Sequence, residues 1–242
     1  MDKSQVKILI LHGWGSSAQN WSKVKDALES RGAEVILPDL PGFGQNLILD
    51  KPWSVDDYAQ WVFDFCQKQG LSQFFLLGHS FGGGIAVKLA SSFPLAIRGL
   101  ILASPALKRR KGPVYWFVLF WAKIGKFIFS LPPFSFLQPL ARKIIYFIIG
   151  KRDYYRLEDE TIKKTFRNVV EKDMIGYLPK INIPTLIIWG DKDMMTPFKD
   201  ASLVQKGIKN SQLEIVKGAN HALNLHNAEI LAEKVLNFTN KL

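Results

Sequence analysis

Short apolar runs, separated by polar or glycine-containing turns, recur along the chain. Runs of strand length occupy residues 6–11, 34–37, 74–77, 100–103, 185–189 and 213–216. Between them, helical spacing of apolar residues predicts helices over 21–31, 54–68, 200–206 and 228–239, and another directly after Ser80. Because strands alternate with helices, the pattern predicts an α/β fold with a mostly parallel sheet of about six strands and helices on both faces.

The alternation is interrupted between residues 105 and 180. This segment contains the aromatic run YWFVLFW at 115–121, two prolines at 132–133 and a second apolar run at 144–149. Its longest apolar stretch, residues 114–122, has nine residues, whereas a membrane-spanning helix needs about 20. We therefore interpret 105–180 as an inserted helical cap, and 1–104 with 181–242 as one core domain.

Charge distinguishes this cap from the core. The chain has 242 residues, 48% of them hydrophobic, which suffices for one sizeable core. Its formal net charge is +11, and residues 105–180 carry 16 Lys and Arg against 6 Asp and Glu, a net of +10. The core domain is therefore nearly neutral, and the cap is basic and rich in aromatic residues.

The N-terminus and the single cysteine bear on the cellular compartment. Only four apolar residues, 8–11, stand between Lys7 and His12, too few for the apolar region of a secretory signal. Cys66 has no second cysteine with which to form an internal disulfide, which fits a reducing compartment. We expect a cytoplasmic protein in which Cys66 is a core residue.

The stretch FFLLGHSFGGG at 74–84 is typical of a strand, a sharp turn and a helix. Gly78, Ser80 and Gly82 form the G-x-S-x-G pattern, in which side chains two residues from the serine would collide with the neighbouring strand or helix. This turn exposes the serine hydroxyl at a helix N-terminus, where backbone N–H groups favour developing negative charge. Ser80 is therefore the candidate nucleophile.

A nucleophilic serine needs a base, and the base needs an orienting acid. Asp191 and Asp193 follow the strand at 185–189, and His221 follows the last strand. The chain order Ser, Asp, His is the order used by a serine on this kind of turn. The other histidines are expected to make local hydrogen bonds, cap or pack: His12, His79 and His226.

These motifs resemble those of the α/β-hydrolase superfamily over essentially the whole chain outside the cap. The turn HGWG at 12–15 resembles the family's oxyanion loop, which implies an oxyanion hole formed by the backbone N–H groups of Trp14 and Phe81. The family's acid stands three residues after the glycine of a W-G-x-x-D turn, which implies Asp193 and leaves Asp191 to cap the turn. The turn PDLPGFG at 38–44 resembles another family turn, whose Asp39 is structural.

Within the superfamily, LHGWG at 11–15 with Trp21 downstream resembles bacterial carboxylesterases that demethylate pimeloyl-carrier-protein methyl ester. The resemblance implies an enzyme, a carboxylesterase-type serine hydrolase that works through an acyl-enzyme. Other functions on this fold stay open: a lipase or thioesterase directed at lipid or carrier protein, a C–C bond hydrolase, and a slow-turnover small-molecule receptor. A serine at position 80 argues against dehalogenases and epoxide hydrolases, which have an aspartate there.

No cofactor or metal is expected. The histidines are scattered in sequence, there is no cysteine cluster, and the glycines at 82–84 lack the G-x-G-x-x-G spacing of a dinucleotide site. The expected ligand is a small-molecule ester. An anionic membrane surface or an acyl carrier protein could bind the basic cap, whereas the many large apolar residues of the cap argue against nucleic acid.

The cap generates a prediction about partners. Basic residues at 108–111, 123, 126, 142–143 and 151–152 flank its apolar runs, as in a surface helix at an anionic interface; the alternative is a lid with a solvated basic face. We expect the protein to sediment with anionic vesicles at low salt and less as salt rises. Reversing the charges of Arg109, Arg110 and Lys111 should reduce sedimentation and leave turnover of a small soluble ester unchanged. Failure to bind anionic vesicles, neutral vesicles and acyl carrier protein would contradict the interface.

Overall fold

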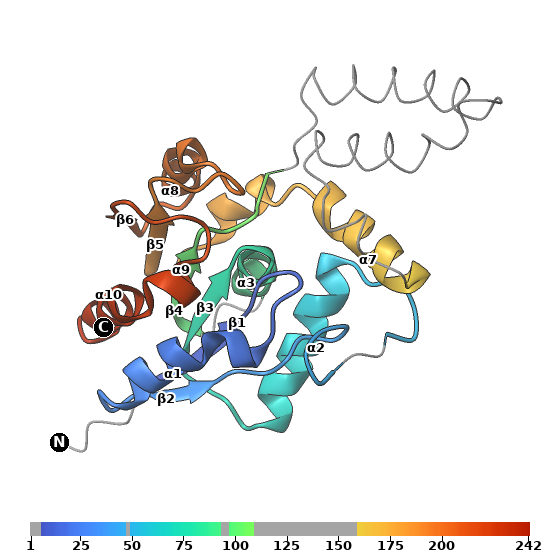
Figure 1. Cartoon of the computed structure of the whole chain (residues 1–242), viewed down its shortest axis with the longest axis horizontal. Helices are drawn as coiled ribbons and strands as arrows, with labels where there is room; N and C mark the ends of the chain where they lie inside the picture. Colours follow the sequence, from blue (N-terminus) through green and yellow to red (C-terminus); the bar gives the residue numbers. More distant parts are fainter. Residues whose placement is uncertain (1–5, 47–48, 93–96, 109–158) are drawn as a thin grey trace, which may run out of the picture.

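The computed structural model describes residues 6–46, 49–92, 97–108 and 159–242. Within these residues the strands form one sheet in the order β2-β1-β3-β4-β5-β6, and all neighbouring strands are parallel. The strands are β1 (Lys7–Leu11), β2 (Glu34–Ile36), β3 (Phe74–His79), β4 (Ile97–Ala103), β5 (Thr185–Gly190) and β6 (Ser211–Val216). The predicted six-stranded parallel sheet is confirmed (Figure 1).

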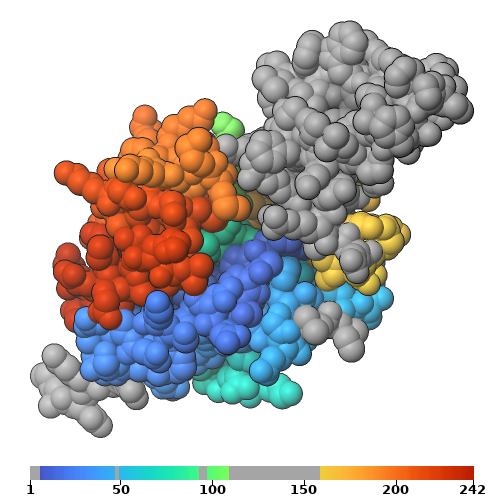
Figure 2. Space-filling model, in the orientation of Figure 1, coloured from blue at the N-terminus to red at the C-terminus, as the bar shows by residue number. Residues whose placement is uncertain are grey.

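Helices cover both faces of the sheet. They are α1 (Ser22–Glu29), α2 (Val55–Lys68), α3 (Phe81–Ser92), α7 (Glu160–Glu171), α8 (Ala201–Gly207), α9 (Leu223–His226) and α10 (Ala228–Thr239). Helices α2, α3 and α8 pack on one face of the sheet, and α1 and α10 pack on the other. Figure 2 shows the blue N-terminal part of the chain packed beside the red C-terminal part. Arg31, which follows α1, forms an ion pair with Glu229 of α10 at 2.7 Å.

Successive strand residues enter opposite cores, because side chains alternate along a strand. In β1, Leu9 and Leu11 pack with α2 and α3, whereas Ile8 and Ile10 pack with α1. The central strands β3 and β5 are buried on both faces, which explains why they appear in the sequence as continuous apolar runs. Cys66 lies in the α2 core, as expected, and burial raises the pKa of its thiol to about 11.

Several element limits differ from the predicted ones. Trp21 ends a 3-10 turn (Ala18–Trp21) and does not begin the next helix, which starts at Ser22. Strand β4 begins at Ile97, three residues before the predicted run, because Gly99 can pair there beside Phe75 where a larger residue would collide with the Phe75 ring. The side chain of Trp21, at the end of its 3-10 turn, is fully buried in the same core cluster as α1.

Part of the predicted cap lies outside the described residues, from 109 to 158. The described remainder includes α7 and the 3-10 segment η4 (Ile175–Lys180), and Met174 and Leu178 lie in the same core cluster as α2 and α3. None of the helices formed by the described residues has the length and apolar character needed to cross a membrane.

The tightest packing in the sheet lies where β3 turns into α3. A Cβ atom on Gly82 would lie 2.2 Å from the carbonyl oxygen of Leu11, at the end of β1. A Cβ atom on Gly78 would lie 2.5 Å from the carbonyl oxygen of Gly82. Both glycines are therefore required by close backbone approach, as predicted from the G-x-S-x-G pattern.

We expect Gly82→Ala to destabilise the fold by more than about 3 kcal/mol, since the methyl group would meet backbone that cannot move alone. Gly84→Ala in the same helix is the matched control, because the nearest atom to its added Cβ is 3.5 Å away. This control should keep or raise stability by up to about 1 kcal/mol, from the better helix propensity of alanine. Urea unfolding of both variants measures the difference, and equal midpoints would contradict the packing argument.

Candidate active site

Ser80 stands on the turn between β3 and α3 in a strained conformation. Its φ is 52°, in the left-handed region that non-glycine residues rarely adopt. Its N–H donates to the carbonyl of Ala103 at 3.1 Å, and its carbonyl accepts from Gly83 N at 3.0 Å and from Ala106 N at 2.9 Å. These three backbone bonds hold the strained residue at the carboxyl edge of the sheet, with its side chain half-buried.

Asp193 and His221 meet across two loops at the same edge. Asp193 follows β5, His221 follows β6, and His221 Nδ1 lies 2.8 Å from Asp193 Oδ2. Burial opposes ionisation of Asp193, but hydrogen bonds and the charge of His221 keep the pKa of the carboxyl below its ordinary value. An ionised Asp193 accepts a hydrogen bond from the Nδ1–H of His221, which leaves Nε2 as the ring nitrogen that can act as a base.

The Asp193 carboxylate is held by more than the histidine. Its Oδ1 accepts from the backbone N–H groups of Met195 and Thr196, both at 2.9 Å. Thr196 Oγ1 donates to Oδ2 at 2.9 Å and lies 3.2 Å from His221 Nδ1. Sequence analysis did not predict a role for Thr196. The available signal was its position three residues after Asp193, from which a threonine can hydrogen-bond the aspartate side chain across a turn.

Asp191 occupies a different environment from Asp193. It is exposed, and its Oδ1 accepts from Gly218 N at 2.7 Å, which ties the loop after β5 to the loop after β6. It therefore caps the turn and makes no bond to His221, whereas Asp193 is 3% exposed. The geometry favours Asp193 over Asp191 as the partner of the histidine.

The turn at 13–16 has a fixed peptide orientation. Ser16 N donates to Gly13 O at 3.2 Å and Gly15 has φ of +67°, the features of a type II turn. His12 Nδ1 also lies 2.8 Å from Gly13 O. Because Leu40 N–H donates to His12 Nε2 at 3.0 Å, the proton of the neutral ring is on Nδ1 and donates to Gly13 O.

This orientation determines where the Trp14 N–H points. In a trans planar peptide the N–H of Trp14 is directed opposite to the carbonyl of Gly13, and hence away from His12. A Cβ atom on Gly13 would lie 3.4 Å from Ser80 Cβ, so the turn packs directly against the serine. Burial lowers the pKa of His12, which keeps its ring in the neutral form that this arrangement needs.

Aromatic rings fix the two predicted oxyanion residues relative to each other. The Trp14 ring contacts Phe81 with centroids 5.4 Å apart and also packs edge-on against Phe43 and Phe166 at 4.8 and 5.0 Å. Phe81 is the first residue of α3, so its N–H lies in the helix turn that lacks intrahelical acceptors. Both N–H groups therefore belong to rigid parts of the backbone next to Ser80.

The structure brings the predicted site residues Ser80, Asp193 and His221 to one edge of the sheet, but not all of them are hydrogen-bonded to one another. Asp193 and His221 are directly bonded, and the His221 ring packs against His79, the residue before Ser80, with centroids 4.8 Å apart. No hydrogen bond joins Ser80 to His221, both of which are described residues. Such bonds often tighten only in the substrate complex.

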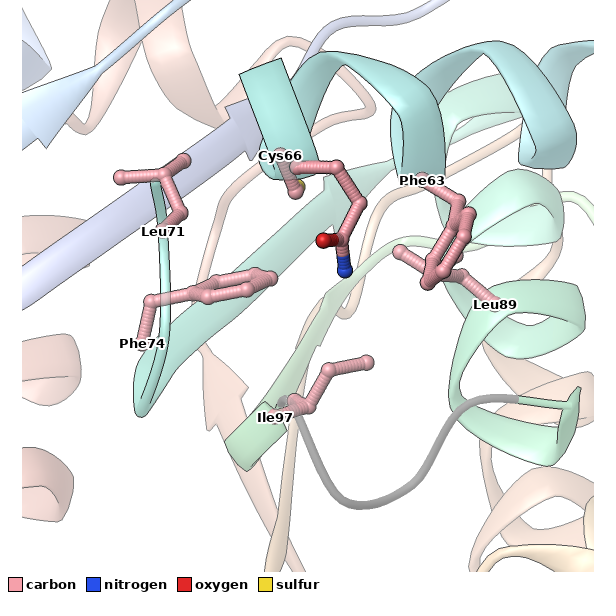
Figure 3. Close-up of a pocket in the computed structure, with 7 residues that line it drawn as sticks. Phe63, Cys66, Leu71, Phe74, Leu89 and Ile97 are labelled. Atoms are coloured by element: carbon pink, nitrogen blue, oxygen red, sulfur yellow. The ribbon is translucent and has the colours of Figure 1, made fainter. Parts of the chain in front are cut away.

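A pocket at the opposite edge of the sheet is too small for a substrate. It lies between α2 and the amino ends of β3 and β4, with Cys66, Phe74 and Ile97 in its wall (Figure 3). Its volume is about 10 Å³, room for about one water molecule. Within the described residues, no group of three or more His, Cys, Asp or Glu side chains is placed to hold a metal ion.

The comparisons with known proteins agree with this architecture. Residues 7–126 match the family described as alpha/beta hydrolase fold. An uncharacterized protein of Mycobacterium tuberculosis is 30% identical, with 88% of this chain and 69% of that protein covered. Lipase 3 of a Moraxella species is 27% identical (88% and 71% covered), and a pimeloyl-[acyl-carrier protein] methyl ester esterase of Wigglesworthia glossinidia brevipalpis is 27% identical (90% and 87% covered).

A solved structure shares the fold at low identity. The esterase from Exiguobacterium antarcticum superimposes with a TM-score of 0.76 at 22% identity, covering 98% of this chain and 92% of that one. Together with the sheet order and the turn at Ser80, these matches establish that the chain belongs to the α/β-hydrolase superfamily.

Proposed function

We propose that this α/β hydrolase cleaves carboxylic esters, with Ser80 as nucleophile, His221 as base and Asp193 as the orienting acid. The observation that carries the proposal is the 2.8 Å contact between His221 Nδ1 and Asp193 Oδ2, on loops that follow β5 and β6. Superfamily relatives named esterase and lipase support the same general chemistry.

In the proposed mechanism His221 Nε2 takes the proton of Ser80 as Oγ bonds to the ester carbonyl carbon. The oxyanion accepts hydrogen bonds from the N–H groups of Trp14 and Phe81, each worth roughly 10²–10³ in rate. The intermediate collapses, the alcohol leaves with the proton from His221, and the acyl group stays on Ser80. Water, deprotonated by His221, then attacks the acyl-enzyme and releases the carboxylic acid.

A lipid-directed lipase is the second candidate, and one feature of the acid loop favours it. Met194 and Met195, directly after Asp193, are 87% and 64% exposed. Two exposed apolar side chains beside the candidate acid suit contact with a lipid surface or an acyl chain. Hydrolysis rates across acyl chain lengths, with and without lipid vesicles, separate this candidate from an esterase for small soluble substrates.

The nucleophile assignment predicts that Ser80→Ala lowers p-nitrophenyl ester turnover by about 10⁴-fold or more. A fluorophosphonate should label the native protein once, at Ser80. Ser91→Ala, which removes a hydroxyl from the same helix, is the matched control and should keep normal turnover, since Ser91 Oγ bonds only the carbonyl of Lys88 among the described residues. Retention of most activity by Ser80→Ala would refute the enzyme assignment. A single turnover by the native protein would favour the receptor alternative.

The acid assignment predicts different outcomes for two aspartates on one loop. Asp193→Asn should lower kcat by about 10⁴, because the amide favours the wrong tautomer of His221. Asp191→Asn should change kcat little, since an amide oxygen can still accept from Gly218 N. Steady-state kinetics on both variants measure the two kcat values. A large loss in Asp191→Asn with little change in Asp193→Asn would identify Asp191 as the acid.

A further inference from the structure

His79 contacts three parts of the candidate site. It ends β3 and is followed directly by Ser80, and it is 6% exposed. A Cβ atom on Gly13 would lie 3.1 Å from His79 Nδ1, so the ring also packs against the turn that presents the Trp14 N–H. Its centroid lies 4.8 Å from that of His221 and 5.6 Å from that of Trp21, which is fully buried behind it.

The polar contact of this ring is to the backbone of the candidate base. His79 Nε2 lies 2.9 Å from the carbonyl oxygen of His221. Since a carbonyl only accepts, Nε2 carries a proton and donates it. Burial, reinforced by the adjacent His221, lowers the pKa of His79 to about 3, so the ring is neutral under ordinary conditions and its Nδ1 is unprotonated.

His221 is consequently held through both its side chain and its backbone. Its side chain is bonded to Asp193, and its carbonyl is bonded to His79. The second bond connects the base to the residue covalently attached to the candidate nucleophile. A hydrogen bond between these two positions limits how far the loop after β6 can move from Ser80.

We propose that His79 is a positioning residue, whose Nε2–H holds the carbonyl of His221 and thereby sets the spacing between Ser80 and the base. The inference rests on the proposed function. His79 exchanges no proton with substrate. Its neutrality also matters, because His221 becomes an imidazolium during the reaction and a second cation 4.8 Å away would oppose that charge.

Two substitutions separate the hydrogen bond from packing of the ring. His79→Leu removes the donor, and we expect kcat for a p-nitrophenyl ester to fall by about 10²-fold with KM nearly unchanged, as for a misplaced catalytic group. His79→Gln keeps an N–H near the position of Nε2 and should restore most of the rate. His226→Leu, at an exposed histidine of α9, is the control and should match the native protein.

The rates are compared per mole of folded protein, with folding measured by circular dichroism. Unchanged kcat in folded His79→Leu, or equal losses in the Leu and Gln variants, would overturn the proposal. Ser80→Ala is assayed beside them: if it retains activity, the proposed function fails, whatever the His79 variants do.

A measurement on the native protein covers the case in which His79→Leu does not fold. With ¹⁵N-labelled histidine, the His79 resonance is identified as the one that disappears in His79→Gln. It should show the neutral Nε2–H tautomer throughout pH 5 to 8. This range lies above the lowered pKa of His79 and spans the ordinary histidine pKa of about 6.5. An Nδ1–H tautomer, or titration near that ordinary value, would overturn the proposal independently of any activity.

Discussion

Burial of the sheet on both faces is the constraint on which the rest of the structure depends. The sheet lies between α1 and α10 on one side and α2, α3 and α8 on the other. Each strand is parallel to its neighbours, because the connecting helices return the chain to the same end of the sheet. All carboxyl ends consequently lie at one edge. The turns after β1, β3, β5 and β6 are distant in sequence, and this topology brings them to the same edge, where they contact one another.

The elements that sequence could predict are those determined by local pattern. Buried strands appear as apolar runs, and the glycines around Ser80 follow from backbone contacts that any G-x-S-x-G turn creates. Asp193 and His221 were predicted from their places after successive strands, and the structure adds the bond between them. The resemblance to a known family supplied the choice between Asp193 and Asp191, which spacing alone left open.

Other features depend on contacts between distant segments and leave no periodic signal. Thr196 reaches Asp193 through a turn that any small polar residue could form, and nothing in the sequence around His79 indicates that its ring bonds the carbonyl of His221, 142 positions away. Ser104 is similar: it directly follows β4 with φ of 44°, it is fully buried, and its carbonyl oxygen lies 3.2 Å from Thr196 Oγ1. Positive φ at both Ser80 and Ser104 places backbone strain after two neighbouring strands, at the edge that holds the site.

The fixed peptide between Gly13 and Trp14 has a consequence for the proposed enzyme. The Gly13 carbonyl accepts two hydrogen bonds, from His12 Nδ1 and Ser16 N, and a peptide flip would break both in a buried place. These two bonds hold the peptide in one orientation, so that the proposed oxyanion donor, the Trp14 N–H, is already directed away from His12 before any substrate binds.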